Sequence, residues 1–202
     1  MGAFDGGCRG FAQGETRGAG GGRSLQYRNK SGDHRRRRQE AGQLATLCRQ
    51  HDVPLIINDD VELALAIDAD GVHLGRDDGD PQRTRARLGA DRLIGVSCYN
   101  DFDRAVTAAA QGADYIAFGS FFGSPTKPQA VRATPDLLKR ARRELSLPAV
   151  AIGGITPENG GALVRAGADM LAVITAVFDQ PDVLGAARRF AHLFDPSEDT
   201  IP

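Results

Sequence analysis

The chain has 202 residues, of which 41% are hydrophobic and 25% charged, and its formal net charge is −1. These values suit one soluble domain with a substantial core, and they lack the broad positive excess of nucleic-acid-binding proteins. No apolar run approaches the roughly 20 residues that a membrane span needs, and three cysteines without CxxC spacing indicate reduced thiols. We therefore expect a cytoplasmic protein that binds neither nucleic acid nor membrane.

The elements in chain order begin with residues 1–23, which are dense in glycine and nearly free of aliphatic residues. Such a segment buries little apolar surface, so we expect it to be irregular or disordered. Continuous aliphatic runs then predict buried strands at 24–28, 54–58, 71–75, 93–98, 115–120, 149–153 and 170–175. Amphipathic stretches predict helices at 33–51, 60–67, 81–88, 101–112, 134–145, 157–166 and 181–194.

Strict alternation of strand and helix favours parallel βα units. The turns QGADY (111–115) and AGADM (166–170) repeat one pattern, in which glycine ends a helix and the next strand follows. We predict an α/β fold of the TIM (βα)8-barrel type over residues 24–195, followed by a tail at 196–202. Seven units are recognisable, so the first βα unit is missing or replaced by the glycine-rich segment.

Polar residues follow several of these strands, at the end where barrel enzymes carry their active sites. Gln26, Arg28 and Lys30 alternate along one strand and therefore share a face, which would suit an anion with several oxygens such as pyrophosphate. An ordinary strand end with surface charges is an equally weighted alternative. The next two strands are followed by Asn58-Asp59-Asp60 and Gly75-Arg76-Asp77-Asp78. Carboxylates at neighbouring strand ends could share Mg²⁺ with a phosphate ligand, although a single aspartate there more often caps a helix.

The later strands carry further candidates. The loop 119–128 offers hydroxyls and one lysine and could close over an anionic ligand. The Gly153–Gly154 pair permits close approach of backbone N–H groups to a phosphate. His73 lies within an apolar strand and is interpreted as a core residue, and no histidine is placed to activate Cys98. Arg35 to Arg38 point in different directions on a helix, so we interpret most of them as solvated surface.

Taken together, the segments resemble the thiamine phosphate synthase family from about Leu25 to the last helix. The segments that carry the resemblance are LQYRNKS, PLIINDDVELALAIDADGVHLGRDD, IGVSCYN, YIAFGSFFGSPTKPQA, VAIGGITPEN and AGADMLAVITAVF. The resemblance implies a Mg²⁺-dependent transferase that joins hydroxymethylpyrimidine diphosphate to thiazole phosphate and releases pyrophosphate. Its partners would be these small-molecule substrates, and the sequence leaves a homo-oligomer open.

The resemblance also implies a site, carried over residue by residue. Asp59 and Asp78 would ligate Mg²⁺, while Arg28, Lys30 and Lys127 would be catalytic by neutralising the leaving group. The substrate-binding residues implied are Gln26, Tyr27, Arg28, Asn29, Lys30, Asn58, Ser97, Ser124, Pro125, Thr126, Lys127, Gly154, Ile174 and Thr175.

Two departures from the family pattern accompany the resemblance. Position 124 is serine where many relatives have threonine, which keeps the hydroxyl. The N-terminus lacks the family's first strand and helix, and either a mis-assigned start or reading frame or a truncated paralogue would explain this. Two other functions stay open: a thiazole tautomerase-like sister enzyme, and a non-catalytic paralogue that binds phosphate ligands.

Overall fold

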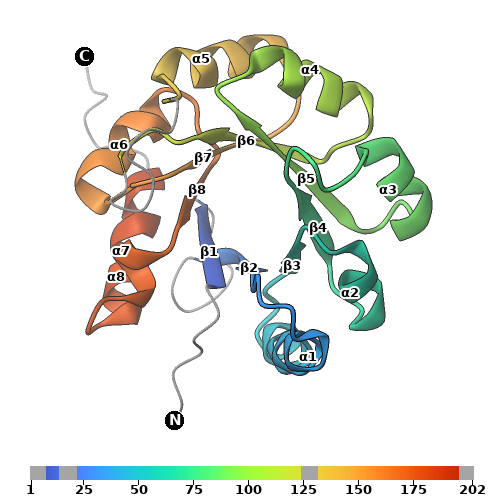
Figure 1. The fold of residues 1–202 in the computed structure, drawn as a ribbon. Coiled ribbons are helices and arrows are strands. Elements are labelled where there is room, and N and C mark those ends of the chain that lie inside the picture. The colour runs from blue at the N-terminus through green and yellow to red at the C-terminus, as the bar shows by residue number, and fades with distance from the viewer. Residues whose placement is uncertain (1–7, 14–21, 124–131, 196–202) are drawn as a thin grey trace, which may run out of the picture.

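The computed structural model describes residues 8–13, 22–123 and 132–195, which form an α/β fold with a curved sheet and helices outside it (Figure 1). All seven predicted strands are confirmed. They are β2 (Gly22–Tyr27), β3 (Leu55–Asn58), β4 (Gly71–Leu74), β5 (Leu93–Tyr99), β6 (Tyr115–Gly119), β7 (Ala149–Ile152) and β8 (Met170–Val173). They pair in parallel in chain order, as strands connected by helical crossovers do.

Of the helices that the structure describes, the first six lie between these strands along the chain, and the last two follow β8. They are α1 (His34–Gln50), α2 (Val61–Ala66), α3 (Pro81–Leu88), α4 (Phe102–Ala110), α5 (Pro135–Glu144), α6 (Pro157–Arg165), α7 (Thr175–Phe178) and α8 (Val183–Ala191), with a 3₁₀ turn at His192–Phe194. The short helix α7 was not predicted. Aspartate side chains cap several helix starts, among them Asp101, which accepts the backbone N–H of Arg104 at the start of α4. None of the helices in the described ranges is long and apolar enough to cross a membrane.

An additional strand, β1 (Cys8–Gln13), lies in the segment for which we expected irregular structure, so that expectation is wrong for these residues. Strand β1 pairs antiparallel with both β2 and β8 and closes the sheet. The pairing uses backbone N–H and C=O groups that the edges of β2 and β8 would otherwise leave unpaired, so it needs no aliphatic side chains. The α/β class with seven parallel strands is confirmed, whereas a complete barrel of eight parallel units is not what the described residues form.

The core has two layers because side chains alternate across each strand. On β6, Ile116 and Phe118 are fully buried in the large cluster that includes the helices, whereas Tyr115 and Ala117 belong to a smaller cluster with Val150. The predicted glycine turns are also present, since Gly112 and Gly167 have φ of +86° and +110°. Glycine adopts this left-handed backbone without the steric cost of a Cβ atom.

Candidate functional site

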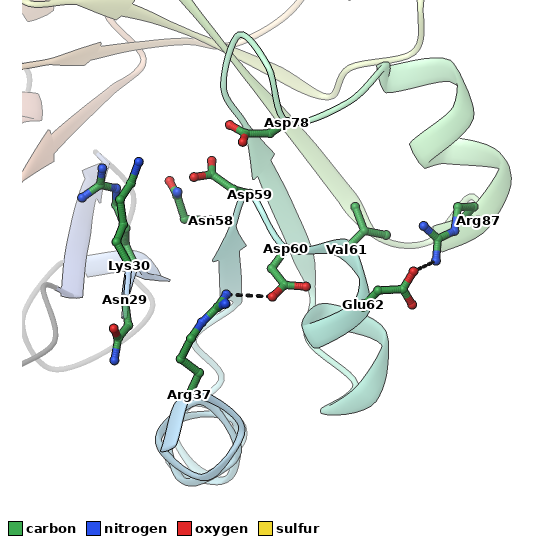
Figure 2. A pocket seen from close by; sticks show the side chains of 11 residues that line it. Asn29, Lys30, Arg37, Asn58, Asp59, Asp60, Val61, Glu62, Asp78 and Arg87 are labelled. Carbon is green, nitrogen blue, oxygen red and sulfur yellow. Dashed lines mark hydrogen bonds and ion pairs between the residues drawn. The ribbon is translucent and has the colours of Figure 1, made fainter. Parts of the chain in front are cut away.

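A cavity of about 520 Å³ opens where β2, β3 and β4 end. Figure 2 shows polar side chains around it from the end of β2, the turn between β3 and α2, and the loop after β4, with Arg37 of α1 beside them. The lining residues are Arg28, Asn29, Lys30, Arg37, Asn58, Asp59, Asp60, Val61, Glu62, Asp78 and Arg87. Segments from successive strand ends therefore form one site with a basic side and an acidic side.

The basic side comes from the residues that follow β2. Arg28 and Lys30 both line the cavity, as the alternation of the strand predicted. Gln26 is buried behind them, and its Nε2 donates a hydrogen bond of 2.6 Å to Oδ1 of Asn58. Asn29 also lines the cavity, and its Nδ2 donates to Glu40 at 2.9 Å. These side-chain amides join the end of β2 to β3 and α1, so the two cations project from a fixed base.

The acidic side consists of Asp59 and Asp78, which come from different loops and face each other (Figure 2). The backbone N of Gly75 donates to Oδ2 of Asp78 at 2.9 Å. A Cβ atom on Gly75 would lie 2.3 Å from that same oxygen, so only glycine leaves room for this carboxylate. Burial, together with a hydrogen bond and repulsion from Asp78, raises the pKa of Asp59 to about 6, although Lys30 and Arg28 oppose the shift.

Two facing carboxylates, one of them with a raised pKa, fit a hard divalent cation, because the cation would replace the shared proton. Mg²⁺ is usually held by one or two carboxylates, with water and substrate phosphates completing its coordination. The described residues contain no cluster of three or more His, Cys, Asp or Glu residues around a possible metal. The donor set thus fits a metal that is completed by a phosphate ligand.

Ser97 lies at the end of β5, and its hydroxyl belongs to a hydrogen-bonded group inside the sheet. Its Oγ is 2.8 Å from Nε2 of His73, whose Nδ1 is 3.1 Å from the hydroxyl of Tyr115. His73 and Tyr115 are both buried, which agrees with the interpretation of His73 as a core residue. Arg104 fixes the neighbouring backbone by donating to the carbonyls of Ser97 and Gly75, at 2.7 and 2.9 Å.

Tyr27 and Cys98 lie near the site in sequence, but their side chains are buried and do not line the cavity. Tyr27 points away from the cavity, because it alternates with Gln26 and Arg28; it is buried, and its hydroxyl donates to Glu40 at 2.7 Å. Its side chain is therefore not positioned to contact a ligand in this cavity. Cys98 is also buried, which raises the pKa of its thiol to about 12, so the thiol is not a nucleophile.

The remaining candidates lie further around the same end of the sheet. Gly154 follows β7 with φ of +64°, and its Cβ would lie 2.9 Å from the Cβ of Phe122. Ile174 and Thr175 follow β8 at the start of α7. None of these three residues lines the cavity described above. The expected contacts at Ser124, Pro125, Thr126 and Lys127 lie outside the described residues.

Sequence reasoning missed part of the lining: Arg37, Asp60, Val61, Glu62 and Arg87. Arg37 belongs to the basic run that we interpreted mostly as surface, and Arg35, Arg36 and Arg38 are indeed exposed. The charge run itself did not distinguish Arg37. Helical spacing could have done so, because Arg37 lies one turn before the buried Ala41.

The fold and site define an α/β protein whose polar ligand cavity lies at the carboxyl ends of parallel strands. A family model described as thiamine monophosphate synthase matches residues 9–177. A thiamine-phosphate synthase of Azoarcus is 60% identical over 170 residues, which cover 84% of this chain and 82% of the relative. One from Thiobacillus denitrificans is 54% identical over 182 residues, covering 89% and 86%.

Among solved structures, thiamine phosphate pyrophosphorylase from Pyrococcus furiosus matches with a TM-score of 0.79 and 32% identity. That match covers 87% of this chain and 84% of the other. A 3-hexulose-6-phosphate synthase from Salmonella typhimurium, at 18% identity and a TM-score of 0.60, shares the fold alone. The chain belongs to the thiamine monophosphate synthase family.

Proposed function

We propose that this protein is a thiamine-phosphate synthase, a transferase of thiamine biosynthesis that acts in the cytoplasm. It would join hydroxymethylpyrimidine diphosphate to thiazole phosphate and release pyrophosphate. The observation that carries the proposal is the cavity in which Arg28 and Lys30 lie with the Asp59–Asp78 pair. Cations and a metal-binding carboxylate pair together suit a diphosphate, whereas either one alone would suit many ligands.

In this proposal Asp59 and Asp78 would hold Mg²⁺, and the cation would supply positive charge near the diphosphate leaving group. Arg28, Lys30 and Lys127 neutralise the remaining charge that develops on pyrophosphate as the carbon–oxygen bond breaks. Both bonding electrons leave with pyrophosphate, so a pyrimidinylmethyl cation remains, and the electron-rich aminopyrimidine ring stabilises it. Ser97 would contact this substrate, and Asn58 would lie near its diphosphate.

The second substrate completes the reaction. The thiazole nitrogen donates its lone pair to the cation, forms the new carbon–nitrogen bond and becomes the thiazolium nitrogen. Ser124 and Thr126 would contact the thiazole, while the backbone at Gly154, with Ile174 and Thr175, would hold its phosphate. Holding both substrates in one site supplies most of the advantage, because capture then needs no diffusional encounter. No general base is required, in line with His73 being buried and hydrogen-bonded.

We also propose that the sheet is a variant of the (βα)8 barrel in which antiparallel β1 takes the position of the first parallel strand. The pairing of β1 with both β2 and β8 supports this interpretation.

The test is release of pyrophosphate by the purified protein with both substrates and Mg²⁺. Release that needs both substrates, and that Arg28→Met reduces by about a hundredfold or more, is the expected result. The Arg38→Met variant removes an exposed arginine from the same charge run and serves as the control. Saturable binding of the phosphate ligands without turnover would instead indicate a non-catalytic paralogue, and isomerisation of a thiazole substrate alone would indicate the sister activity.

A further inference from the structure

Arg37 differs from the other arginines of its run because it turns into the cavity (Figure 2). Its Nη2 donates to Oδ2 of Asp60 at 2.7 Å, and the two side chains are only 16% and 26% exposed. Its Nε is buried and has no hydrogen-bond partner among the described residues. Solvation alone does not explain the position of Arg37, because its mostly buried guanidinium has lost contact with water and makes one ion pair within the described residues.

Asp60 is held from two further directions. Its Oδ1 accepts the backbone N–H of Leu63 at 2.9 Å, which caps α2, and its own backbone N donates to the carbonyl of Asn58 at 2.9 Å. The ion pair with Arg37 therefore connects α1 to a tight turn that already has one helix fixed to it. Movement of α1 or loss of Arg37 would be transmitted directly to this turn.

Asp59 lies at the centre of the turn and has φ of +66°. A residue other than glycine in this left-handed region costs about 1 kcal/mol or more, and it stays there only when its surroundings hold it. On one side its backbone N donates to the carbonyl of His73 at 2.9 Å. On the other side lies Asp60, which is paired with Arg37. The strained conformation is the one that directs the Asp59 carboxylate toward Asp78.

We propose that Arg37 is a positioning residue, whose ion pair with Asp60 holds the Asn58–Asp60 turn so that Asp59 and Asp78 converge on one cation. This inference rests on the proposed function, since it concerns the metal of that site. In this inference Arg37 acts through Asp60, because its Nη2 donates to that carboxylate. It also offsets repulsion between Asp60 and Asp59, which are adjacent in the chain.

The experiment measures Mn²⁺ binding to the full-length protein by electron paramagnetic resonance, in buffer without any phosphate ligand. Residues that orient metal ligands typically contribute about 10–100-fold to metal affinity, so we expect Arg37→Met to weaken Mn²⁺ binding by about tenfold or more. The Arg38→Met control should bind as the wild type does. The Arg37→Lys variant keeps the charge and should recover part of the loss.

A second variant, Asp60→Asn, keeps a good helix cap for α2 while removing the ion pair, so it tests the same contact if Arg37→Met folds poorly. Asp60→Asn should weaken Mn²⁺ binding, and adding Arg37→Met to it should cost little more, because the two side chains act as one unit. Circular dichroism melting curves establish that each variant is folded.

Three results would overturn the proposal. Wild-type Mn²⁺ affinity in folded Arg37→Met and Asp60→Asn would show that the turn needs no ion pair. Weaker binding of inorganic pyrophosphate by Arg37→Met in metal-free buffer would show that Arg37 contacts phosphate itself. If the wild type bound no Mn²⁺, and thus did not differ from Asp59→Asn, the metal site of the proposed function would fail, and this inference with it. The wild-type arm separates that failure from the other two.

Discussion

The Nε2 of His73 lies 2.8 Å from the hydroxyl oxygen of Ser97, so a buried ring on β4 is hydrogen-bonded to a candidate substrate contact on β5. Tyr115 is hydrogen-bonded to the other ring nitrogen of His73. Burial raises the pKa of the Tyr115 hydroxyl, which therefore stays neutral. The three side chains extend from the interior of the sheet to the end where the cavity lies.

We expect different consequences at the two ends of this hydrogen-bonded group. A hydrogen bond to a charged ligand contributes about 1.5–3 kcal/mol, so Ser97→Ala should lower turnover by about tenfold or more with a small change in melting temperature. Tyr115→Phe should instead lower the free energy of unfolding by about 1 kcal/mol and leave KM for both substrates near the wild-type values. Steady-state kinetics and urea unfolding of the two variants test this contrast, which equal losses of activity would contradict.

The raised pKa of Asp59 predicts how stability depends on pH. Its folded-state pKa of about 6 lies above the ordinary value of 3.8, so the neutral form stabilises the fold. That contribution is fully present below the ordinary value and is lost as the pH rises through about 6. Without metal, the melting temperature of the wild type should therefore fall relative to that of Asp59→Asn over this range.

Mg²⁺ should reverse this loss, because the cation binds the ionised pair. Calorimetric melting with and without Mg²⁺ should show stabilisation of the wild type at pH 7, much less at pH 4.5, and none in Asp59→Asn. An identical pH dependence in the wild type and in Asp59→Asn would show that Asp59 does not titrate in this way.

Three aspartates form a repeated contact at the end of the sheet opposite the cavity. The Oδ2 atoms of Asp70, Asp114 and Asp169 accept the backbone N–H groups of Leu55, Ile94 and Ala149, at 2.7, 2.6 and 2.8 Å. Each aspartate is the residue directly before one strand, and it accepts a hydrogen bond from the beginning of the strand that comes before that one in the chain. The contact thus joins β3 to β4, β5 to β6 and β7 to β8.

Because these contacts are remote from the cavity, we expect Asp169→Ala to lower the free energy of unfolding by about 1 kcal/mol without changing turnover. Asp114→Ala should cost more, since Asp114 is also paired with Arg85. Chemical denaturation checks both values, with Asp91→Ala as an exposed control. A loss of activity at unchanged stability would contradict a purely structural role.

Substitution by alanine should change the free energy of unfolding in opposite directions at Gly95 and at Gly42. A Cβ on Gly95 would lie 1.9 Å from the Tyr115 ring, so Gly95→Ala must displace that ring and should cost about 1–3 kcal/mol or more. Gly42 lies inside helix α1, and apart from its chain neighbours and the backbone of the helix itself no atom lies within 4 Å of its Cβ position, so Gly42→Ala should stabilise by about 0.5–1 kcal/mol. Urea unfolding of both variants provides the measurement, and a stabilised Gly95→Ala would show that the interior is looser than the contact implies.

The sequence by itself determined the seven parallel strands, the helices between them and the three cavity-lining segments after β2, β3 and β4. These features depend on local periodicity and on the position of polar residues at strand ends, which a single chain records directly. The sequence could also have predicted that the Tyr27 side chain points away from the cavity, because it alternates with Gln26 and Arg28 and neighbouring residues of a strand face opposite sides.

Only the tertiary structure decided the rest, because it depends on pairing between segments distant along the chain. Strand β1 forms through backbone hydrogen bonds to β2 and β8. The composition of the glycine-rich segment that contains it does not predict this pairing. Helical spacing places Arg37 on the buried side of α1, but its ion pair with Asp60 exists only because α1 packs beside the turn that carries Asp60. The shared environment that raises the pKa of Asp59 likewise exists only when two loops meet. Local patterns thus specified the elements, and long-range packing specified which side chains act together.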